Sequence, residues 1–467
     1  MKKSFPLFFL VLFSINVSAQ DISGFWNGML KVPGMELRVN FNLEKTNDGY
    51  KATMDSPDQN AFGIPCETVS FENKALTITL PNMAIEYSGK WISADSIEGT
   101  FKQAGQSFPM NLSKKVLKTE KKVRPQEPQG PQSYIQEEIK FENSKDKLIL
   151  AGTLTLPSKE GKFPAVVLIS GSGPQDRNEE VFGHKPFLVL ADHLTKKGIA
   201  VLRFDDRGIG ESTGDFKSAT SFDFATDVEA AISYLKTRKE IDQKHIGLIG
   251  HSEGGLIAPL VATQSNKVNF IVLLAGPGIP GTEILLQQTE LISRASGMDE
   301  TQLQKALKIN KEIYDLVLGS ENIDSFRDQL IPYLKKMIQS NPDMLAQSGM
   351  NEKDFFNAQM NQIATPWMYA FLRYDPAPTL AKVKCPILAL NGEKDLQVPA
   401  KVDIEAIEKA LKSGGNKDVT THIIPNLNHL FQECEKGIPV EYGQIEQTFS
   451  PVALNLISDW ILKQGKE

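Results

Sequence analysis

The stretch GHSEGG at Gly250–Gly255 sets a serine between glycines. It follows the apolar run HIGLI and precedes the helical pattern GGLIAPLVA. In this context the G-x-S-x-G pattern predicts that Ser252 lies on a tight strand-to-helix turn, with its hydroxyl exposed at a sheet edge as a nucleophile. Side chains at Gly250 and Gly254 would collide with neighbouring backbone in so tight a turn. An ordinary glycine turn without chemistry is the alternative.

A serine hydroxyl is a weak nucleophile until a general base takes its proton. When a nucleophilic serine follows a strand in this way, the order along the chain is nucleophile, acid, histidine. Asp395 comes after the apolar run CPILAL and the turn at Asn391 and Gly392, and we predict that it is the acid. Glu393, closer to the turn, is the competitor. A turn carboxylate that caps the next helix is the alternative role for Asp395.

The chain has 6 histidines, and His429 in the loop NLNHLF follows the last predicted strand. We predict that it removes the Ser252 proton and later gives it to the leaving group, while Asp395 fixes the ring tautomer. A surface-loop histidine is the alternative. His184 and His193 precede the serine, which is the wrong order for a base. His245 lies at the start of a predicted strand and His422 lies within one. His251 sits inside the glycine turn, where its side chain should pack down.

Acyl transfer also needs N–H donors for the negatively charged oxygen that develops in the reaction. The helix after Ser252 offers the backbone N–H of Glu253 and the partial positive charge of its N-terminus. The loop GSGPQDR, which follows the strand pattern AVVLIS, offers the backbone N–H of Ser172. A plain Gly-Pro turn is the alternative for that loop.

The loop FDDRGIGESTG, Phe204–Gly214, has too sparse a glycine pattern for a dinucleotide site, and its acidic pair would repel pyrophosphate. We expect a structural loop in which Asp206 or Arg207 ties neighbouring loops together beneath the site. The three cysteines and the histidines show no zinc spacing, and at most one disulfide could form. No metal or cofactor is predicted.

The elements that must position these residues begin at Ile135. Strand and helix patterns alternate from there, which predicts a mostly parallel sheet with helices on both faces. The alternation stops at about 282–373, where the pattern is helical throughout. An insertion between two sheet strands is placed to act as a lid over the carboxyl edge of the strands, where such sheets bind ligands.

The N-terminal part of the chain has three segments of different composition. Residues 1–19 combine two lysines, an apolar run and the small residues of a cleavage site, which predicts a signal peptide cut after Ala19. A membrane anchor is the alternative, although the run is shorter than a span requires. Residues 20–117 alternate with period two and predict a small antiparallel β domain, a sandwich or open barrel. Residues 118–134 are rich in proline and glutamine and predict a linker to the last domain, 135–467.

The motifs together resemble the α/β-hydrolases, above all the secreted bacterial branch that is serine-aminopeptidase-like or esterase-like. The matching pieces run from about Ile135 to the C-terminus: GSGPQDR, RFDDRGIGESTG, GHSEGG, FLRYDP, NGEKDLQVP and NLNHLF. The resemblance implies hydrolysis of an ester, thioester or amide through a triad of Ser252, Asp395 and His429. One departure is that Ser170-Gly171 replaces the usual His-Gly of the oxyanion loop.

Composition limits the partners. A formal charge of −6 argues against nucleic acid or an anionic membrane surface. We expect an exported enzyme, periplasmic or extracellular, without a membrane span after cleavage and with a small-molecule or peptide acyl substrate. A carboxylic ester leads, and an aminopeptidase-type peptidase, a thioesterase and a binding protein on a retired scaffold are the alternatives. The acyl group, the leaving group, the role of the β domain and the oligomeric state are left open.

Overall fold

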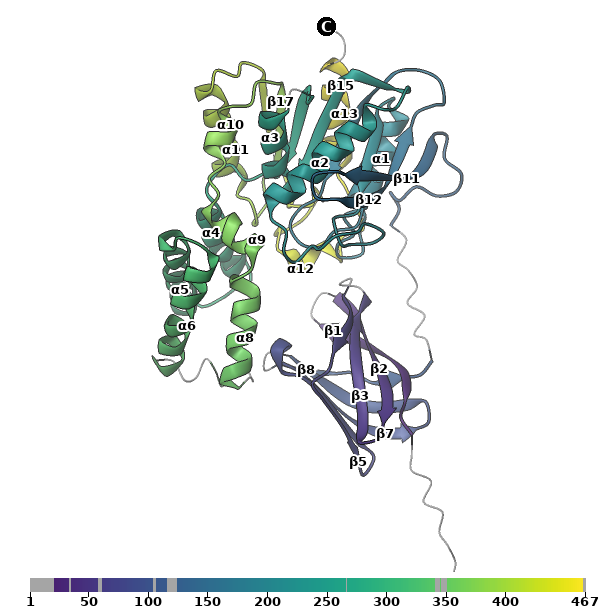
Figure 1. The fold of residues 1–467 in the computed structure, drawn as a ribbon, viewed down its shortest axis with the longest axis vertical. Helices are drawn as coiled ribbons and strands as arrows, with labels where there is room; N and C mark the ends of the chain where they lie inside the picture. The colour runs from purple at the N-terminus through teal and green to yellow at the C-terminus, as the bar shows by residue number, and fades with distance from the viewer. Residues whose placement is uncertain are drawn as a thin grey trace, which may run out of the picture. The chain divides into compact units, whose positions relative to one another are not determined.

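The structure is a computed structural model that describes residues 21–32, 35–57, 61–103, 106–115, 124–265, 267–340, 345 and 351–464. The predicted signal peptide lies outside these residues. The chain forms two compact units, an all-β unit drawn from residues 1–117 and an α/β unit that holds residues 118–467 (Figure 1). Each unit has its own sheet, and only the second carries the residues singled out above.

The all-β unit is a single antiparallel sheet of short strands. Its order is β4-β3-β2-β1-β10-β8-β7-β6-β5, with β9 paired to β8. Strands β3 and β5, from opposite ends of this order, contact each other, so the sheet curls into a half-open barrel. Fully buried aromatic side chains fill its interior, among them Trp26, Phe41, Tyr87 and Phe101. The strands are β1 Gly24–Val32, β2 Met35–Thr46, β3 Gly49–Ser56, β4 Ala61–Pro65, β5 Thr68–Glu72, β6 Ala75–Leu80, β7 Ile85–Ser93, β8 Ser96–Gln103, β9 Gln106–Pro109 and β10 Leu112–Ser113; η2 is Pro81–Met83.

The α/β unit is built on an eight-stranded sheet in the order β11-β12-β14-β13-β15-β16-β17-β18. The β11–β12 and β12–β14 pairs are antiparallel, and every pair from β14 to β18 is parallel. The mostly parallel sheet expected from the sequence is therefore present. The strands are β11 Ile135–Asn143, β12 Leu148–Leu156, β13 Phe163–Ile169, β14 Ala200–Phe204, β15 Ile241–His251, β16 Phe270–Leu274, β17 Ile387–Gly392 and β18 Val419–Ile424.

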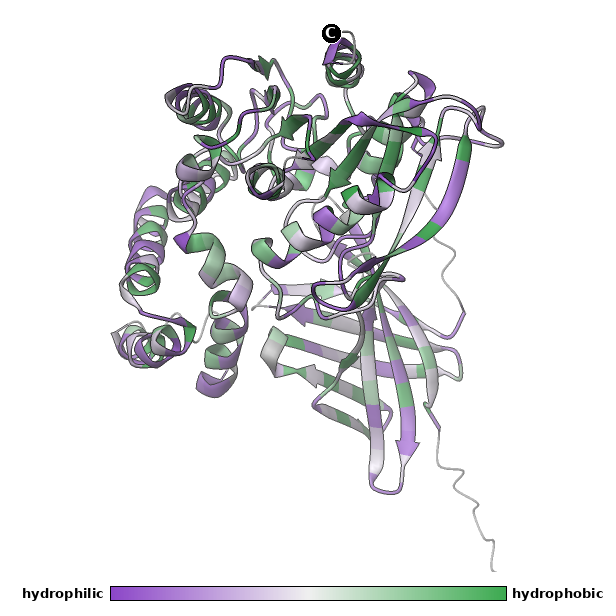
Figure 2. Cartoon of the chain, turned by 45° about the horizontal axis from the view of Figure 1, so that its top comes forward, coloured by the Kyte–Doolittle hydropathy of each residue, from purple (hydrophilic) through white to green (hydrophobic). Residues whose placement is uncertain are grey.

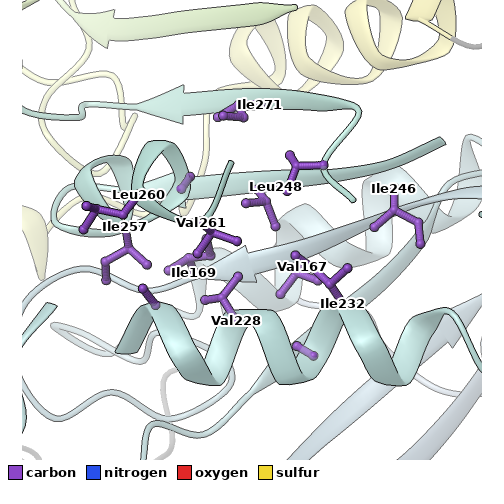
Figure 3. Close-up of a cluster of buried hydrophobic side chains, with 14 of the residues drawn as sticks. Val167, Ile169, Val228, Ile232, Ile246, Leu248, Ile257, Leu260, Val261 and Ile271 are labelled. Atoms are coloured by element: carbon purple, nitrogen blue, oxygen red, sulfur yellow. The ribbon is translucent and has the colours of Figure 1, made fainter. Parts of the chain in front are cut away.

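Helices cover the central strands on both faces, because the strand side chains are apolar on both sides (Figure 2). Figure 3 shows one face, where Val167 and Leu248 of the sheet meet Val228 and Ile232 of α2 and Val261 of α3. The opposite face packs against α1 and α13. These helices are α1 Pro186–Lys196, α2 Ser221–Leu235, α3 Gly254–Gln264 and α13 Pro451–Gln464. Helix α11 Ala400–Ser413 packs on β17 and β18 and also contacts α10 Ala377–Leu380, and the short α12 is Pro439–Tyr442.

Between β16 and β17 the chain leaves the sheet and forms a helical insertion with a small apolar core of its own. The hydropathy of these helices alternates between faces, as expected of helices packed on one side only (Figure 2). The Asp299 side chain caps the second helix by accepting the N–H groups of Thr301 and Gln302. The helices are α4 Gly281–Ala295, α5 Glu300–Gly319, α6 Ile323–Ser340, α8 Glu352–Ile363 and α9 Pro366–Arg373.

Candidate active site

Ser252 lies in the turn between β15 and α3, at the carboxyl end of the central strand. Its φ is 51°, in the left-handed region that a residue with a side chain rarely adopts. A Cβ at Gly250 would lie 2.0 Å from the Gly254 carbonyl oxygen, and one at Gly254 would lie 2.2 Å from the Ile169 oxygen. The steric need for both glycines, expected from the sequence, is therefore present in the structure.

Asp395 and His429 meet at the same sheet edge, after β17 and β18. The His429 Nδ1 and the Asp395 Oδ2 are 2.7 Å apart, and the two residues are 5% and 3% exposed. The second oxygen, Oδ1, accepts the backbone N–H groups of Gln397 and Val398 at 2.8 and 2.9 Å. The carboxylate is thus fixed by its own loop, and because it occupies Nδ1, the Nε2 of His429 is left for proton transfer.

The competing acid, Glu393, has a different partner. Its side chain is exposed, and its Oε2 accepts the backbone N–H of Asn426 at 3.1 Å. The turn at Asn391 and Gly392 directs it to the end of the neighbouring strand. The structure therefore pairs Asp395, and not Glu393, with His429.

The other five histidines have partners of their own or lie on the surface. His184 is fully buried between Thr448 and Tyr442, and His193 contacts Ser458. His245 pairs with Asp242 at the start of β15, and His422 is exposed on β18. His251 packs down into the protein, as expected of its place inside the turn, and its ring lies 4.9 Å from that of His429.

The loop after β13 runs directly beside the serine. A Cβ at Gly171 would lie 3.1 Å from the Ser252 Cβ. The N–H of Gly171 itself donates to the Glu179 Oε1 at 2.7 Å, so it is already used. Within the described residues, neither the Ser172 N–H nor the Glu253 N–H donates to a protein acceptor. Both predicted oxyanion donors are thus free to bind another oxygen.

The loop after β14 ties its neighbours together, as predicted from the sequence. The Asp206 carboxylate accepts the Ser170 hydroxyl and the Gln175 N–H, both at 2.9 Å. Burial raises the pKa of Asp206 and these two hydrogen bonds lower it. Burial has the larger effect, so the pKa lies well above its ordinary value. Arg207 forms an ion pair with Asp227 of α2 at 2.8 Å. Ser170, which stands where a histidine is usual, therefore fastens its loop to the loop after β14 through its hydroxyl.

Glu253 links the serine turn to the helical insertion, a contact that was not predicted from the sequence. Its Oε1 accepts the Ser221 hydroxyl at 2.6 Å and the Trp367 indole N–H at 2.8 Å. Burial raises the pKa of Glu253, against the effect of these hydrogen bonds. Trp367 lies on α9 and stacks on Phe371 with ring centroids 5.2 Å apart. Its partner is 114 residues away, so no local pattern could reveal the pair.

A small cavity beside the turn is lined by Gly171, Phe224 and Ile257 together with three acidic side chains, Asp206, Asp227 and Glu253.

Within the described ranges, no group of three or more histidine, cysteine or acidic side chains could hold a metal ion. The same ranges contain no helix with the length and apolar character that a membrane crossing requires.

The chain is similar to several known proteins. The family model described as serine aminopeptidase, S33 matches residues 185–435. Esterase EstD of Thermotoga maritima is 28% identical over 343 residues, which cover 71% of this chain and 69% of the relative. An uncharacterized 31.7 kDa protein of Escherichia coli is 25% identical over 271 residues, 57% of this chain and 84% of that protein. A solved structure of the Pyrococcus furiosus esterase Pf2001 is 16% identical, covers 73% of this chain and 97% of its own, and has a TM-score of 0.43.

Proposed function

The chain belongs to the serine aminopeptidase S33 family of hydrolases, and from that premise we propose that it hydrolyses carboxylic esters through an acyl-enzyme on Ser252. The observation that carries this proposal is the buried contact of 2.7 Å between His429 and Asp395, at the sheet edge where Ser252 is held at a φ of 51°. A strained serine beside an acid–histidine pair is the arrangement that nucleophilic acyl transfer needs.

In the proposed reaction, the Ser252 Oγ attacks the acyl carbon while the His429 Nε2 takes the hydroxyl proton. Asp395 holds the Nδ1 proton in place and stabilises the imidazolium that forms. The tetrahedral intermediate then expels the alcohol, which leaves with the proton from Nε2. Water attacks the acyl-enzyme in the second half, again with His429 as the base, and releases the acid and the free serine.

The negatively charged oxygen of each intermediate is proposed to bind the N–H groups of Glu253 and Ser172. Two features support them: both lack a protein acceptor in the described chain, and the loop of Ser172 passes beside the serine. The Glu253 N–H also lies at the beginning of α3, where the helix dipole favours negative charge.

Ester hydrolysis is favoured over aminopeptidase activity by the state of the nearby carboxyl groups. An aminopeptidase holds the ammonium group of its substrate, which calls for an ionised carboxylate that is free to bind it. Glu253 and Asp206 each accept two hydrogen bonds from the protein, and Asp227 is paired with Arg207. Burial raises the pKa of Glu253 and Asp206, which disfavours their charged forms, while the Asp227 carboxylate is already paired with an arginine.

The helical insertion, 281–373 in the structure, is proposed to be a lid that selects the substrate. The support is the bond from Trp367 of α9 to Glu253, the residue next to the nucleophile. Since Trp367 is aromatic and half-buried, it supplies an apolar surface beside Glu253.

The test separates the reaction class from the substrate class. The wild type should be labelled by a fluorophosphonate probe and should hydrolyse p-nitrophenyl acyl esters, while aminoacyl p-nitroanilides should be inert. Ser252→Ala should abolish both labelling and turnover. Turnover of the anilides with inert esters would replace the esterase proposal by the peptidase one. A wild type that is neither labelled nor active would instead favour the alternative of a binding protein on a retired hydrolase scaffold.

Export is proposed from the first residues, on the sequence features given above. N-terminal sequencing of the protein from its native host should begin at Gln20, and the protein should be found outside the cytoplasm. Retention of the first 19 residues in the mature protein would contradict the proposal.

A further inference from the structure

A second acid–histidine pair lies beneath the site, between Glu179 and His251. Their contact, Oε1 to Nδ1, is 2.8 Å, and the residues are 3% and 6% exposed. Glu179 comes from the loop after β13 at a φ of 52°, an unfavourable backbone conformation for a glutamate. No step of the proposed reaction uses either side chain, so their burial and strain need another reason.

Both nitrogens of the His251 ring face acceptors. Nδ1 faces the Glu179 carboxylate, and Nε2 lies 3.0 Å from the backbone oxygen of His429. A neutral imidazole has one N–H and would leave one acceptor without a donor, whereas an imidazolium serves both. Burial by itself lowers the pKa of His251. The charge and hydrogen bond of Glu179, together with the hydrogen bond to the His429 carbonyl, raise it by more than burial lowers it, so the pKa of His251 lies above its ordinary value.

Among the described residues, the Glu179 carboxylate is bound by the His251 ring and by one backbone N–H. Its Oε1 also accepts the N–H of Gly171 at 2.7 Å, in the loop that carries the proposed oxyanion donor. Its Oε2 is buried and has no partner within the described part of the chain. A buried carboxylate with so few donors is costly, and His251 is the cation that compensates it.

From these contacts we infer that Glu179 and His251 are positioning residues for the proposed reaction: an imidazolium held by Glu179 fastens the backbone of His429, while the same carboxylate fastens the oxyanion loop. The inference rests on the proposed function. One ion pair thereby fixes the general base and the oxyanion donor relative to Ser252. The titratable groups that face His251 are Glu179, His429 and Asp395.

Glu179→Gln tests these two positioning roles. The amide oxygen still accepts from Gly171 and from Nδ1, so the shape and two hydrogen bonds are kept. It cannot stabilise the second proton on His251, and once that proton is lost the bare Nε2 faces the His429 carbonyl. The kcat on an ester should fall about ten- to a hundredfold at pH 8–9 with KM within about threefold, and the loss should shrink towards pH 6. The rate of fluorophosphonate labelling should follow kcat.

Two further variants separate positioning from folding. His251→Gln places a donor near the Nε2 position without a titrating ring, so its activity relative to wild type should stay constant with pH. Asp242→Asn is the matched control, because the Asp242–His245 contact is also 2.8 Å but lies at the far end of the same strand. That variant should match the wild type within about twofold at every pH, since it is remote from the site.

The outcomes distinguish this inference from the proposed function. A wild type without labelling or turnover overturns the proposed function. A normal wild type with an unchanged Glu179→Gln overturns only the positioning role. Two further outcomes also overturn the positioning role. One is a Glu179→Gln loss of kcat that is the same at every pH. The other is a His251→Gln loss of kcat with the same pH dependence as that of Glu179→Gln. Should Glu179→Gln fail to fold, Glu179→Asp takes its place; it keeps the charge, so its loss should not grow with pH.

Discussion

At the scale of single residues, the site could be predicted where its chemistry is local. Glycine is required on both sides of Ser252, because a Cβ at either position would lie only 2.0 or 2.2 Å from a backbone oxygen of the same turn or the adjacent strand, and the glycine spacing is visible in the sequence. The pairing of His429 with Asp395 could be predicted from the order of the strands alone, because each residue lies in the loop directly after one of the last two strands. Glu179 gave no such signal, because its loop contains other acidic residues and its partner lies 72 positions away.

Asp395→Asn tests the proposed role of Asp395 as the acid of a triad. The amide keeps the shape but presents its partner with the wrong hydrogen-bonding group, so the His429 tautomer is no longer fixed. We expect kcat on an ester to fall by roughly 10³–10⁴ with a small change in KM, measured by steady-state kinetics. The control is Glu393→Gln, the competing carboxylate, which should stay within about threefold. A larger loss in the control would exchange the two roles.

Asp403 on α11 makes the stability depend on pH. It is fully buried, its Oδ1 accepts the Gly278 N–H at 2.6 Å, and its Oδ2 has no partner among the described residues. Burial, with a contribution from the Asp395 charge, raises the pKa of Asp403 to about 7. The folded state therefore binds this proton more tightly than the unfolded chain, and the free energy of unfolding decreases as pH rises from about 4 to about 7.

Asp403→Asn removes this titration. Relative to wild type, the variant should gain roughly 2 kcal/mol of unfolding free energy between pH 5 and pH 8, because only the wild type must ionise a buried carboxyl over that range. Urea titrations at the two pH values measure the difference. An unchanged difference between variant and wild type would show that Asp403 does not titrate in this window.

At the scale of elements, the sheet and its insertion could be predicted because their hydrophobic patterns are periodic. The apolar runs gave the parallel strands, and the helical spacing gave an insertion within a few residues of the observed 281–373. How the insertion attaches to the sheet could not be predicted. That depends on pairs such as Trp367 with Glu253, which join elements far apart in the chain.

Trp367→Phe tests the attachment. It keeps the stacking on Phe371 but removes the indole N–H, so Glu253 loses one of its two donors. The expected result is a loss of about 1–2 kcal/mol in stability by thermal melting and several-fold in kcat/KM. Trp460→Phe is the control, because its indole N–H bonds to Thr420 at 3.3 Å on the other side of the sheet. Equal kinetic losses in both variants would refute a special role for the α9 contact.

At the scale of the whole molecule, the segment predicted as a linker is bound to the α/β unit from residue 124 onward; residues 118–123 lie outside the described ranges. Arg124 is 2% exposed, and its guanidinium donates to the carbonyl oxygens of Phe182, Gly183, Gly443 and Ile445 at 2.7–3.3 Å. The composition of the segment could not predict this anchor, because its acceptors lie 58 to 321 residues away.

Arg124→Gln should destabilise the α/β unit by about 3 kcal/mol, since a shorter amide cannot reach four carbonyl groups and leaves buried acceptors unpaired. Chemical unfolding measures the loss. Arg238→Gln provides the comparison, because that guanidinium binds Glu137 and Glu240 at a half-buried position and its removal should cost about 1 kcal/mol or less. Equal losses would mean that the anchor is no stronger than a surface ion pair.

The Arg124 anchor also has a consequence for the order in which the protein is assembled. Two of its acceptors, Gly443 and Ile445, are synthesised 319 and 321 residues after Arg124. In a growing polypeptide that has not reached them, this guanidinium lacks two of its four acceptors, and the segment around it stays open to proteases. Closure of the anchor therefore reports that these residues have been made, and cleavage near residue 124 should distinguish chains that lack them from chains that contain them.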